Sequence, residues 1–162
     1  MIVFDASTLI LLAKAGLLER FLEASGLKAL IPREVAREAC EEKQSFDALL
    51  IARLIGSKKI AVESLRDRKF FEKIRVEMAL GTGEAEAIAL AVARGADLVA
   101  TDDRTAINAC KLVGLPFTTA LAMLVRMHEN GWLDRNEALL KLETLGTAGR
   151  YKKSLKIGRA HV

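Results

Sequence analysis

Short apolar runs alternate with longer stretches of helical pattern along this chain, and that alternation limits the folds it can adopt. The runs lie at residues 1–4, 29–31, 60–62, 98–101 and 116–118. Short apolar runs separated by helical segments are typical of buried parallel strands. The sequence therefore predicts a three-layer α/β/α domain, in which helices cover both faces of a central, mostly parallel sheet of about four or five strands.

Helical periodicity fills the segments between these runs. The predicted helices lie at residues 7–15, 17–24, 32–42, 46–55, 65–78, 83–94, 104–113, 120–130 and 136–145. Gly16 predicts a break between the first two helices, and Gly131 predicts a turn between the last two. Pro32 suits the first turn of the third helix, because a residue there has no helical partner for its N–H in any case.

The composition indicates one globular domain that stays in the cytoplasm. The chain has 162 residues, of which 51% are hydrophobic, and this is enough for a single core. It contains no apolar run near the roughly 18 residues of a membrane span, and it does not open with a secretory signal pattern. Cys40 and Cys110 have neither metal-ligand nor redox spacing, so we expect reduced thiols. The net charge of +4 is compatible with an anionic partner but does not identify one.

The last six residues look foreign to the rest of the chain. Residues 157–162 match the translation of a widely used sequencing-adapter sequence, so they are suspected not to be native. A natural basic end is the alternative. We expect a single domain over residues 1–145, followed by a basic tail over residues 146–162.

Carboxylates are the main groups that the sequence offers for catalysis. The chain has two histidines, so a histidine base or a histidine-rich zinc site is not expected. For the same reason a serine nucleophile would lack its usual base. The run Gly81-Thr82-Gly83 lacks the Lys-Ser/Thr pair that completes a phosphate-binding loop. The remaining chemistry is that of oxygen ligands and metal ions.

Acidic residues follow two of the predicted strands and lie in two of the predicted helices. Asp5 follows the first strand, Asp102 and Asp103 follow the fourth, and the helices contribute Glu38 and Glu84. The carboxyl ends of parallel strands meet at one edge of a sheet, so the aspartates should lie at the same edge. Taken singly, each acid could instead cap a helix or favour its positive end. Taken together, they favour a site for Mg²⁺ or Mn²⁺, which prefer carboxylate oxygens.

The order and spacing of four motifs resemble the PIN domain over residues 1–145. The motifs are Asp5-Ala6-Ser7, Ile31-Pro32 with Val35 and Glu38, Gly81-Thr82-Gly83-Glu84-Ala85-Glu86-Ala87-Ile88, and Thr101-Asp102-Asp103-Arg104. PIN domains are α/β/α nucleases that cut RNA with Mg²⁺ or Mn²⁺, and many are VapC-like toxins of toxin–antitoxin pairs. The resemblance therefore implies a metal-dependent endoribonuclease that binds RNA, and it implies an antitoxin protein as a partner.

By the same resemblance, four carboxylates would hold the metal and the attacking water: Asp5, Glu38, Glu84 and Asp103. All of them except Glu38 are expected to ligate the metal directly. Ser7 and Thr101 either hydrogen-bond these carboxylates or serve only the local backbone. Arg104 either contacts RNA phosphates or is an ordinary solvated residue in the first turn of a helix.

Two neighbouring acids leave the choice of ligands open. Glu86 is the alternative to Glu84, and the two should not face one metal, because side chains two residues apart on a helix point about 200° apart. Asp102 is the alternative to Asp103, although the spacing after Thr101 in the PIN family favours Asp103.

Two other functions stay open. The run Val3-Phe4-Asp5, followed by Thr8-Leu9, resembles the opening of the haloacid-dehalogenase-like phosphohydrolases, but Ser7 stands where that family has a second acid. The other alternative is a noncatalytic module that keeps the fold to bind RNA or a partner. PIN domains often dimerise or bind an antitoxin through apolar faces such as those of residues 7–24 and 46–55, so a homodimer is a further expectation, although ordinary core packing explains the same faces.

Overall fold

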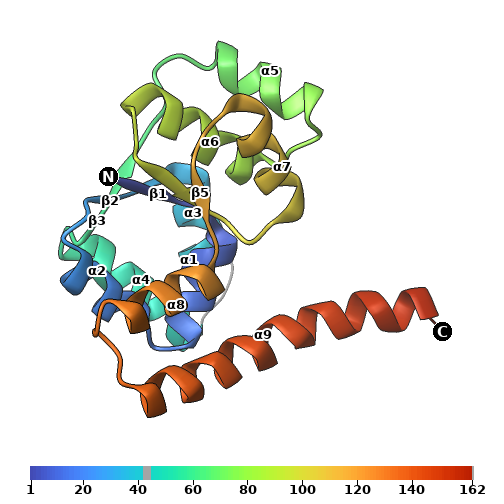
Figure 1. The fold of residues 1–162 in the computed structure, drawn as a ribbon. Coiled ribbons are helices and arrows are strands. Elements are labelled where there is room, and N and C mark those ends of the chain that lie inside the picture. Colours follow the sequence, from blue (N-terminus) through green and yellow to red (C-terminus); the bar gives the residue numbers. More distant parts are fainter. Residues whose placement is uncertain (42–44, 162) are drawn as a thin grey trace.

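Five parallel strands form the centre of the molecule. The computed structural model describes residues 1–41 and 45–161, with side chains described up to residue 148. The strands follow the order β3-β2-β1-β4-β5 across the sheet, and each neighbouring pair is parallel (Figure 1). Their bounds are β1 (Ile2–Phe4), β2 (Ala29–Pro32), β3 (Ile60–Glu63), β4 (Leu98–Ala100) and β5 (Phe117–Thr118). The predicted sheet is confirmed.

The helical segments of the described chain follow the predicted order. They are α1 (Ala6–Lys14), α2 (Leu18–Ser25), α3 (Arg33–Ala36), the π-helical turn η1 (Arg37–Glu41), α4 (Phe46–Gly56), α5 (Lys69–Glu77), α6 (Thr82–Arg94), α7 (Arg104–Val113), α8 (Ala120–Glu129) and α9 (Arg135–His161). Gly16 and Gly131 both adopt positive φ, at 69° and 76°, in the turns predicted for them.

Three helices differ by more than one residue from their predicted bounds. The helix predicted at 65–78 begins only at Lys69, whose N–H is bound by the Asp67 side chain (2.9 Å), so that residues 65–68 serve as a connection from β3. The helix predicted at 32–42 divides into α3 and η1, and its predicted end at residue 42 lies outside the described residues. The last helix continues to His161, since no proline interrupts it. The domain boundary at residue 145 stays a prediction.

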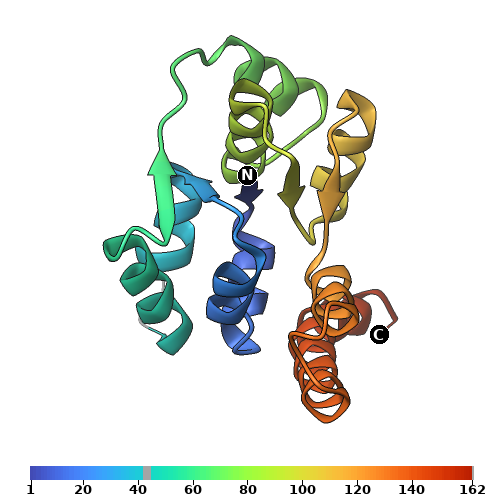
Figure 2. The same cartoon turned by 60° about the vertical axis from the view of Figure 1, so that its left-hand side comes forward.

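Successive residues of β1 face opposite sides of the sheet and enter two clusters of buried side chains. Ile2 and Phe4 pack with residues of α1, α2, α4 and α8, and Phe4 meets Phe21 edge-on with ring centroids 6.2 Å apart. Val3 packs with residues of α5, α6 and α7. Figure 2 shows these two groups of helices on opposite sides of the sheet. The predicted three-layer α/β/α architecture is confirmed.

Neither cysteine is bonded in the described structure. Cys40 is half-buried and Cys110 is buried, and both are free thiols. Burial raises the pKa of Cys110 to about 11, so this thiol stays protonated and unreactive at neutral pH. None of the helices described for this chain is long and apolar enough to cross a membrane.

Strands β1 and β4 are neighbours and end at the same level. Phe4 pairs with Ala100, and the N–H of Asp5 donates to the carbonyl oxygen of Ala100 (2.9 Å). Asp5 and Thr101 therefore leave the sheet side by side at its carboxyl edge, as the sequence predicts. This edge positions the acidic residues.

Candidate active site

Asp5 is a buried carboxylate held by three hydrogen bonds. Its side chain is 3% exposed. Oδ1 accepts from the N–H of Ala6 (2.7 Å), while Oδ2 accepts from the hydroxyls of Thr101 (2.8 Å) and Ser7 (3.1 Å). Donors on both oxygens fix the orientation of the carboxylate and lower the cost of burying its charge.

Thr101 connects Asp5 to Asp103. The buried Thr101 hydroxyl donates to Asp5 and also accepts from the backbone N–H of Asp103 (3.2 Å). One oxygen atom therefore sets both the rotation of Asp5 and the path of the backbone that carries Asp103. The structure thus favours the reading in which Ser7 and Thr101 hydrogen-bond the acidic residues.

Asp103 and Glu84 lie at the starts of α7 and α6, and the charge of Asp103 acts on both Asp5 and Glu84. Oδ2 of Asp103 accepts from the N–H of Ala106 (2.9 Å), and Oε2 of Glu84 accepts from the N–H of Gly81 (2.9 Å). Burial raises the pKa of Asp5 above its ordinary value, and the Asp103 charge raises it further. Burial likewise raises the pKa of Glu84, followed by the charges of Asp103 and Asp5. Three carboxylates from three segments therefore repel one another.

Glu38 reaches the same region from η1. The three atoms nearest to a Cβ placed on Gly83 all belong to the Glu38 carboxylate: such a Cβ would overlap Oε1 and lie 3.2 Å from Cδ. Glu38 thus lies against the first turn of α6, beside the residue that precedes Glu84. The π-helical turn changes the direction in which Glu38 leaves the backbone relative to a continuous α-helix, and such turns are frequent at functional sites.

Glu86 serves a structural contact on another side of α6. Its carboxylate is 7% exposed, and its two oxygens accept from the N–H of Glu34 (3.1 Å) and from Nη1 of Arg68 (3.1 Å). The guanidinium of Arg68 also lies 4.2 Å from the ring centre of Phe71. Glu86 therefore joins the start of α3 to the start of α5, and the structure brings Glu84 rather than Glu86 to the other acids.

Asp102 points toward α1 and α8. Its Oδ2 accepts from the Thr8 hydroxyl (2.5 Å) and from the N–H of Ala120 (3.1 Å), the first residue of α8. Its backbone N–H donates to Ser7 Oγ (3.1 Å). The adjacent aspartates thus have different partners, and Asp103 is the one whose charge acts on Asp5 and Glu84.

Arg104 is the exposed residue that opens α7, directly after Asp103. Within the described part of the chain its guanidinium has no hydrogen bond or ion pair. Sequence reasoning misses the contact between Gly83 and Glu38: the Gly81-Thr82-Gly83 run is read there as an incomplete phosphate loop and as part of a PIN-like motif, with no role for the missing side chain. The available signal is a glycine inside an otherwise alanine-rich helical pattern, which marks a close approach by another group.

The acidic residues offer donors that fit a hard cation. Within the described residues, no three His, Cys, Asp or Glu side chains are placed close enough together to hold a metal ion. Asp103 and Glu84 instead bond the N–H groups at their helix starts, contacts that a side-chain rotation would release. A divalent cation would offset the repulsion that raises the pKa of Asp5 and Glu84. An all-carboxylate donor set suits Mg²⁺ or Mn²⁺.

Asp5→Asn should stabilise the metal-free protein, with a gain that grows with pH. Because the pKa of Asp5 is raised above 3.8 in the folded chain, that state binds the proton more tightly than the unfolded chain does. The resulting stability is fully present below pH 3.8 and is lost as the pH rises through the raised folded value. In metal-free buffer, the melting temperatures of variant and wild type should agree near pH 3 and differ by about 2–4 °C at pH 7. A difference independent of pH would contradict the prediction.

The chain was compared with known families, proteins and structures. A family model described as a PIN domain matches residues 1–158. No curated protein and no solved structure matches the chain. The matched range contains all six acidic residues discussed above, the whole parallel sheet and helices on both of its faces. The chain belongs to the PIN-domain family.

Proposed function

We propose that this protein is a metal-dependent endoribonuclease that hydrolyses RNA phosphodiester bonds. The observation that carries the proposal is the buried Asp5 carboxylate, which the Thr101 hydroxyl joins to the backbone of Asp103 at the carboxyl edge of the sheet, while Glu38 lies against Gly83, the residue before Glu84. Membership of the PIN-domain family supports it, because PIN domains are generally nucleases. Ordinary helix capping accounts for the backbone bonds of Asp5, Glu84 and Asp103, but not for the bond from the Thr101 hydroxyl to the buried Asp5.

Each acidic residue has a distinct part in this proposal. Asp5, Glu84 and Asp103 would hold Mg²⁺ or Mn²⁺, which activates water and offsets charge on the phosphate when bound. Asp5 would be the most rigidly held of these ligands, since its oxygens are oriented by Thr101, Ser7 and a backbone N–H. Glu38, which lies against Gly83, would orient the attacking water.

Arg104 is the proposed contact for the RNA backbone. It is exposed, lies next to Asp103 and has no partner among the described residues. Phosphate contacts supply most sequence-independent affinity for nucleic acids. One tryptophan and one tyrosine in the chain offer little surface for base stacking, so recognition would rest on backbone and shape.

We further propose a role as the toxin of a cytoplasmic toxin–antitoxin pair. An antitoxin protein and a second copy of the chain are the proposed partners. The exposed apolar side chains of Phe46 and Leu49 on α4 support such a contact, because they are 84% and 68% accessible.

Cleavage of a mixed pool of structured RNAs tests the function. We expect fragments in the presence of Mn²⁺ or Mg²⁺, none with a chelator, and restored cutting when the metal is added back. We also expect either metal to raise the melting temperature, because binding to the folded state stabilises it. Absence of both cutting and metal-induced stabilisation would instead favour a noncatalytic module that binds RNA or a protein partner.

A further inference from the structure

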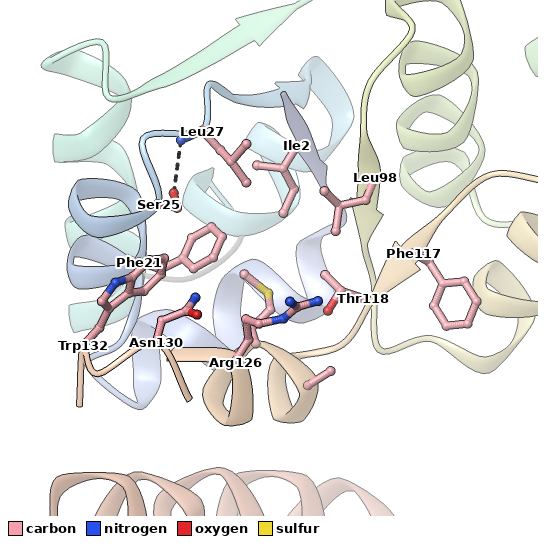
Figure 3. Close-up of a pocket in the computed structure, with 12 residues that line it drawn as sticks. Ile2, Phe21, Ser25, Leu27, Leu98, Phe117, Thr118, Arg126, Asn130 and Trp132 are labelled. Carbon is pink, nitrogen blue, oxygen red and sulfur yellow. Dashed lines mark hydrogen bonds between the residues drawn. The ribbon is translucent and has the colours of Figure 1, made fainter. Parts of the chain in front are cut away.

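A cavity of about 640 Å³ lies at the end of the sheet opposite the acidic residues (Figure 3). It opens between α2, α8 and the amino ends of three strands, since Ile2, Leu98 and Phe117 are the first residues of β1, β4 and β5. The proposed nuclease chemistry uses none of the residues that line it. The cavity is therefore a separate feature of the fold.

The walls of this cavity are mainly apolar. Ile2, Phe21 and Met123 contribute buried side chains, and Leu27 and Trp132 contribute half-buried ones. Pockets for small molecules have volumes of about 300–1,000 Å³ and are lined by hydrophobic and aromatic groups with a few polar ones. The size and lining of this cavity match that description.

The lining residues include one cation, Arg126, and no acid; the other polar groups are two hydroxyls, the Asn130 amide and the Trp132 indole. Arg126 and Asn130 are four residues apart at the end of α8, and Figure 3 shows both side chains extending from this helix on the side of the cavity. Trp132 adds an indole N–H. Neither the Arg126 guanidinium nor the indole N–H has a hydrogen-bond partner among the described residues.

The hydroxyls and the acid around the cavity bond other groups. Ser25 Oγ accepts from the N–H of Leu27 (3.2 Å), and the Thr118 hydroxyl donates to the carbonyl oxygen of Thr119 (3.5 Å). Asp97, which precedes the lining residue Leu98, forms an ion pair with the N-terminal ammonium of Met1. A single unpaired cation at an apolar cavity is complementary to a ligand with one negative charge and an apolar body.

We propose that this cavity binds a small amphipathic carboxylate. The apolar part of the ligand lies against Phe21 and Met123, and its carboxylate accepts from Arg126 and Asn130. Arg126 is exposed, so water solvates its guanidinium when the cavity is empty, and a neutral apolar molecule would gain no charge-assisted hydrogen bond from it. A highly charged, polar molecule would leave the apolar walls uncovered.

Decanoate is the probe for the test, and Trp132 is the reporter, since the chain has one tryptophan. We expect a saturable change in Trp132 fluorescence with decanoate and a weaker affinity for decanol, which has a similar chain but no charge. Arg126→Gln should weaken decanoate binding about tenfold, because it removes a charge-assisted hydrogen bond. Arg135→Gln is the matched control: Arg135 is an exposed arginine on α9 that does not line this cavity, and its loss should leave the affinity unchanged.

A second variant separates loss of charge from loss of space. Ala122 is an exposed lining residue on α8, and Ala122→Phe should block the cavity without changing the charge. Circular dichroism establishes that each variant is folded. The proposal is overturned if wild-type protein shows no saturable response, if decanol binds as tightly as decanoate, or if Arg126→Gln or Ala122→Phe keeps wild-type affinity.

Discussion

Asp5→Asn is expected to reduce metal-dependent RNA cleavage by at least about 100-fold while the protein stays folded. Groups that only orient metal ligands typically contribute about 10–100-fold, and a residue that ligates the metal itself should exceed that range. Asn keeps the shape of the side chain and an oxygen acceptor for Thr101 or Ala6, so the fold has no reason to change. Cleavage rates at saturating Mn²⁺, with melting temperatures alongside, measure the effect.

Asp103→Asn should behave in the same way, and Asp102→Asn is the matched control. Asp102 is next in sequence, but its carboxylate bonds Thr8 and the first N–H of α8. Its replacement should cost about 1 kcal/mol of stability, as for the loss of a helix cap, and should leave cleavage within a few-fold of wild type. Equal loss of activity in both variants would contradict the assignment of Asp103.

Gly83→Ala is expected to lower cleavage by about 100-fold with almost no change in stability. The added Cβ would overlap the Glu38 carboxylate and force it away, and a displacement of about 1 Å can cost that much in rate. The stability should hold, because the displaced atoms are the end of a flexible side chain and alanine is favoured over glycine in a helix. Cleavage rate and melting temperature, measured on the same preparation, separate the two effects.

Gly56→Ala provides the control for this substitution. Gly56 ends α4, and a Cβ placed there would have no atom within 4 Å. It should leave cleavage unchanged and should keep or slightly raise stability, because alanine is favoured over glycine in a helix. Wild-type cleavage by Gly83→Ala would show that the position of Glu38 does not matter, and a large drop in melting temperature would show that the space at Gly83 serves folding instead.

The strand and helix order could be predicted because hydrophobic pattern fixes it locally. The runs that become β1 and β4 are buried and apolar, and the acids that follow them identify the edge where both strands end. Two features escape such reasoning. The π-helical turn at Arg37–Glu41 interrupts a helical pattern that the sequence shows as continuous, and α5 starts at Lys69, where the Asp67 side chain accepts from the backbone N–H.

The acidic residues could be proposed from sequence, but the choice between neighbours could not be made there. Spacing alone leaves Glu84 and Glu86 as alternatives, and the same holds for Asp102 and Asp103. The structure distinguishes them by their partners: Arg68 donates a hydrogen bond to Glu86, and the Thr8 hydroxyl donates one to Asp102. The contact between Gly83 and Glu38 could not be predicted from the sequence either, because Glu38 is 45 residues earlier in the chain.

The run Thr101-Asp102-Asp103 has an evolutionary consequence. Its three side chains have different roles. Thr101 orients Asp5, and Asp102 binds Thr8 of α1 and the first N–H of α8. The charge of Asp103 acts on Asp5. A descendant that lost its chemistry would be free to change Asp103, yet selection for a folded protein would still retain Asp102. Sequences of such inactive descendants should therefore keep an aspartate at position 102 more often than at position 103.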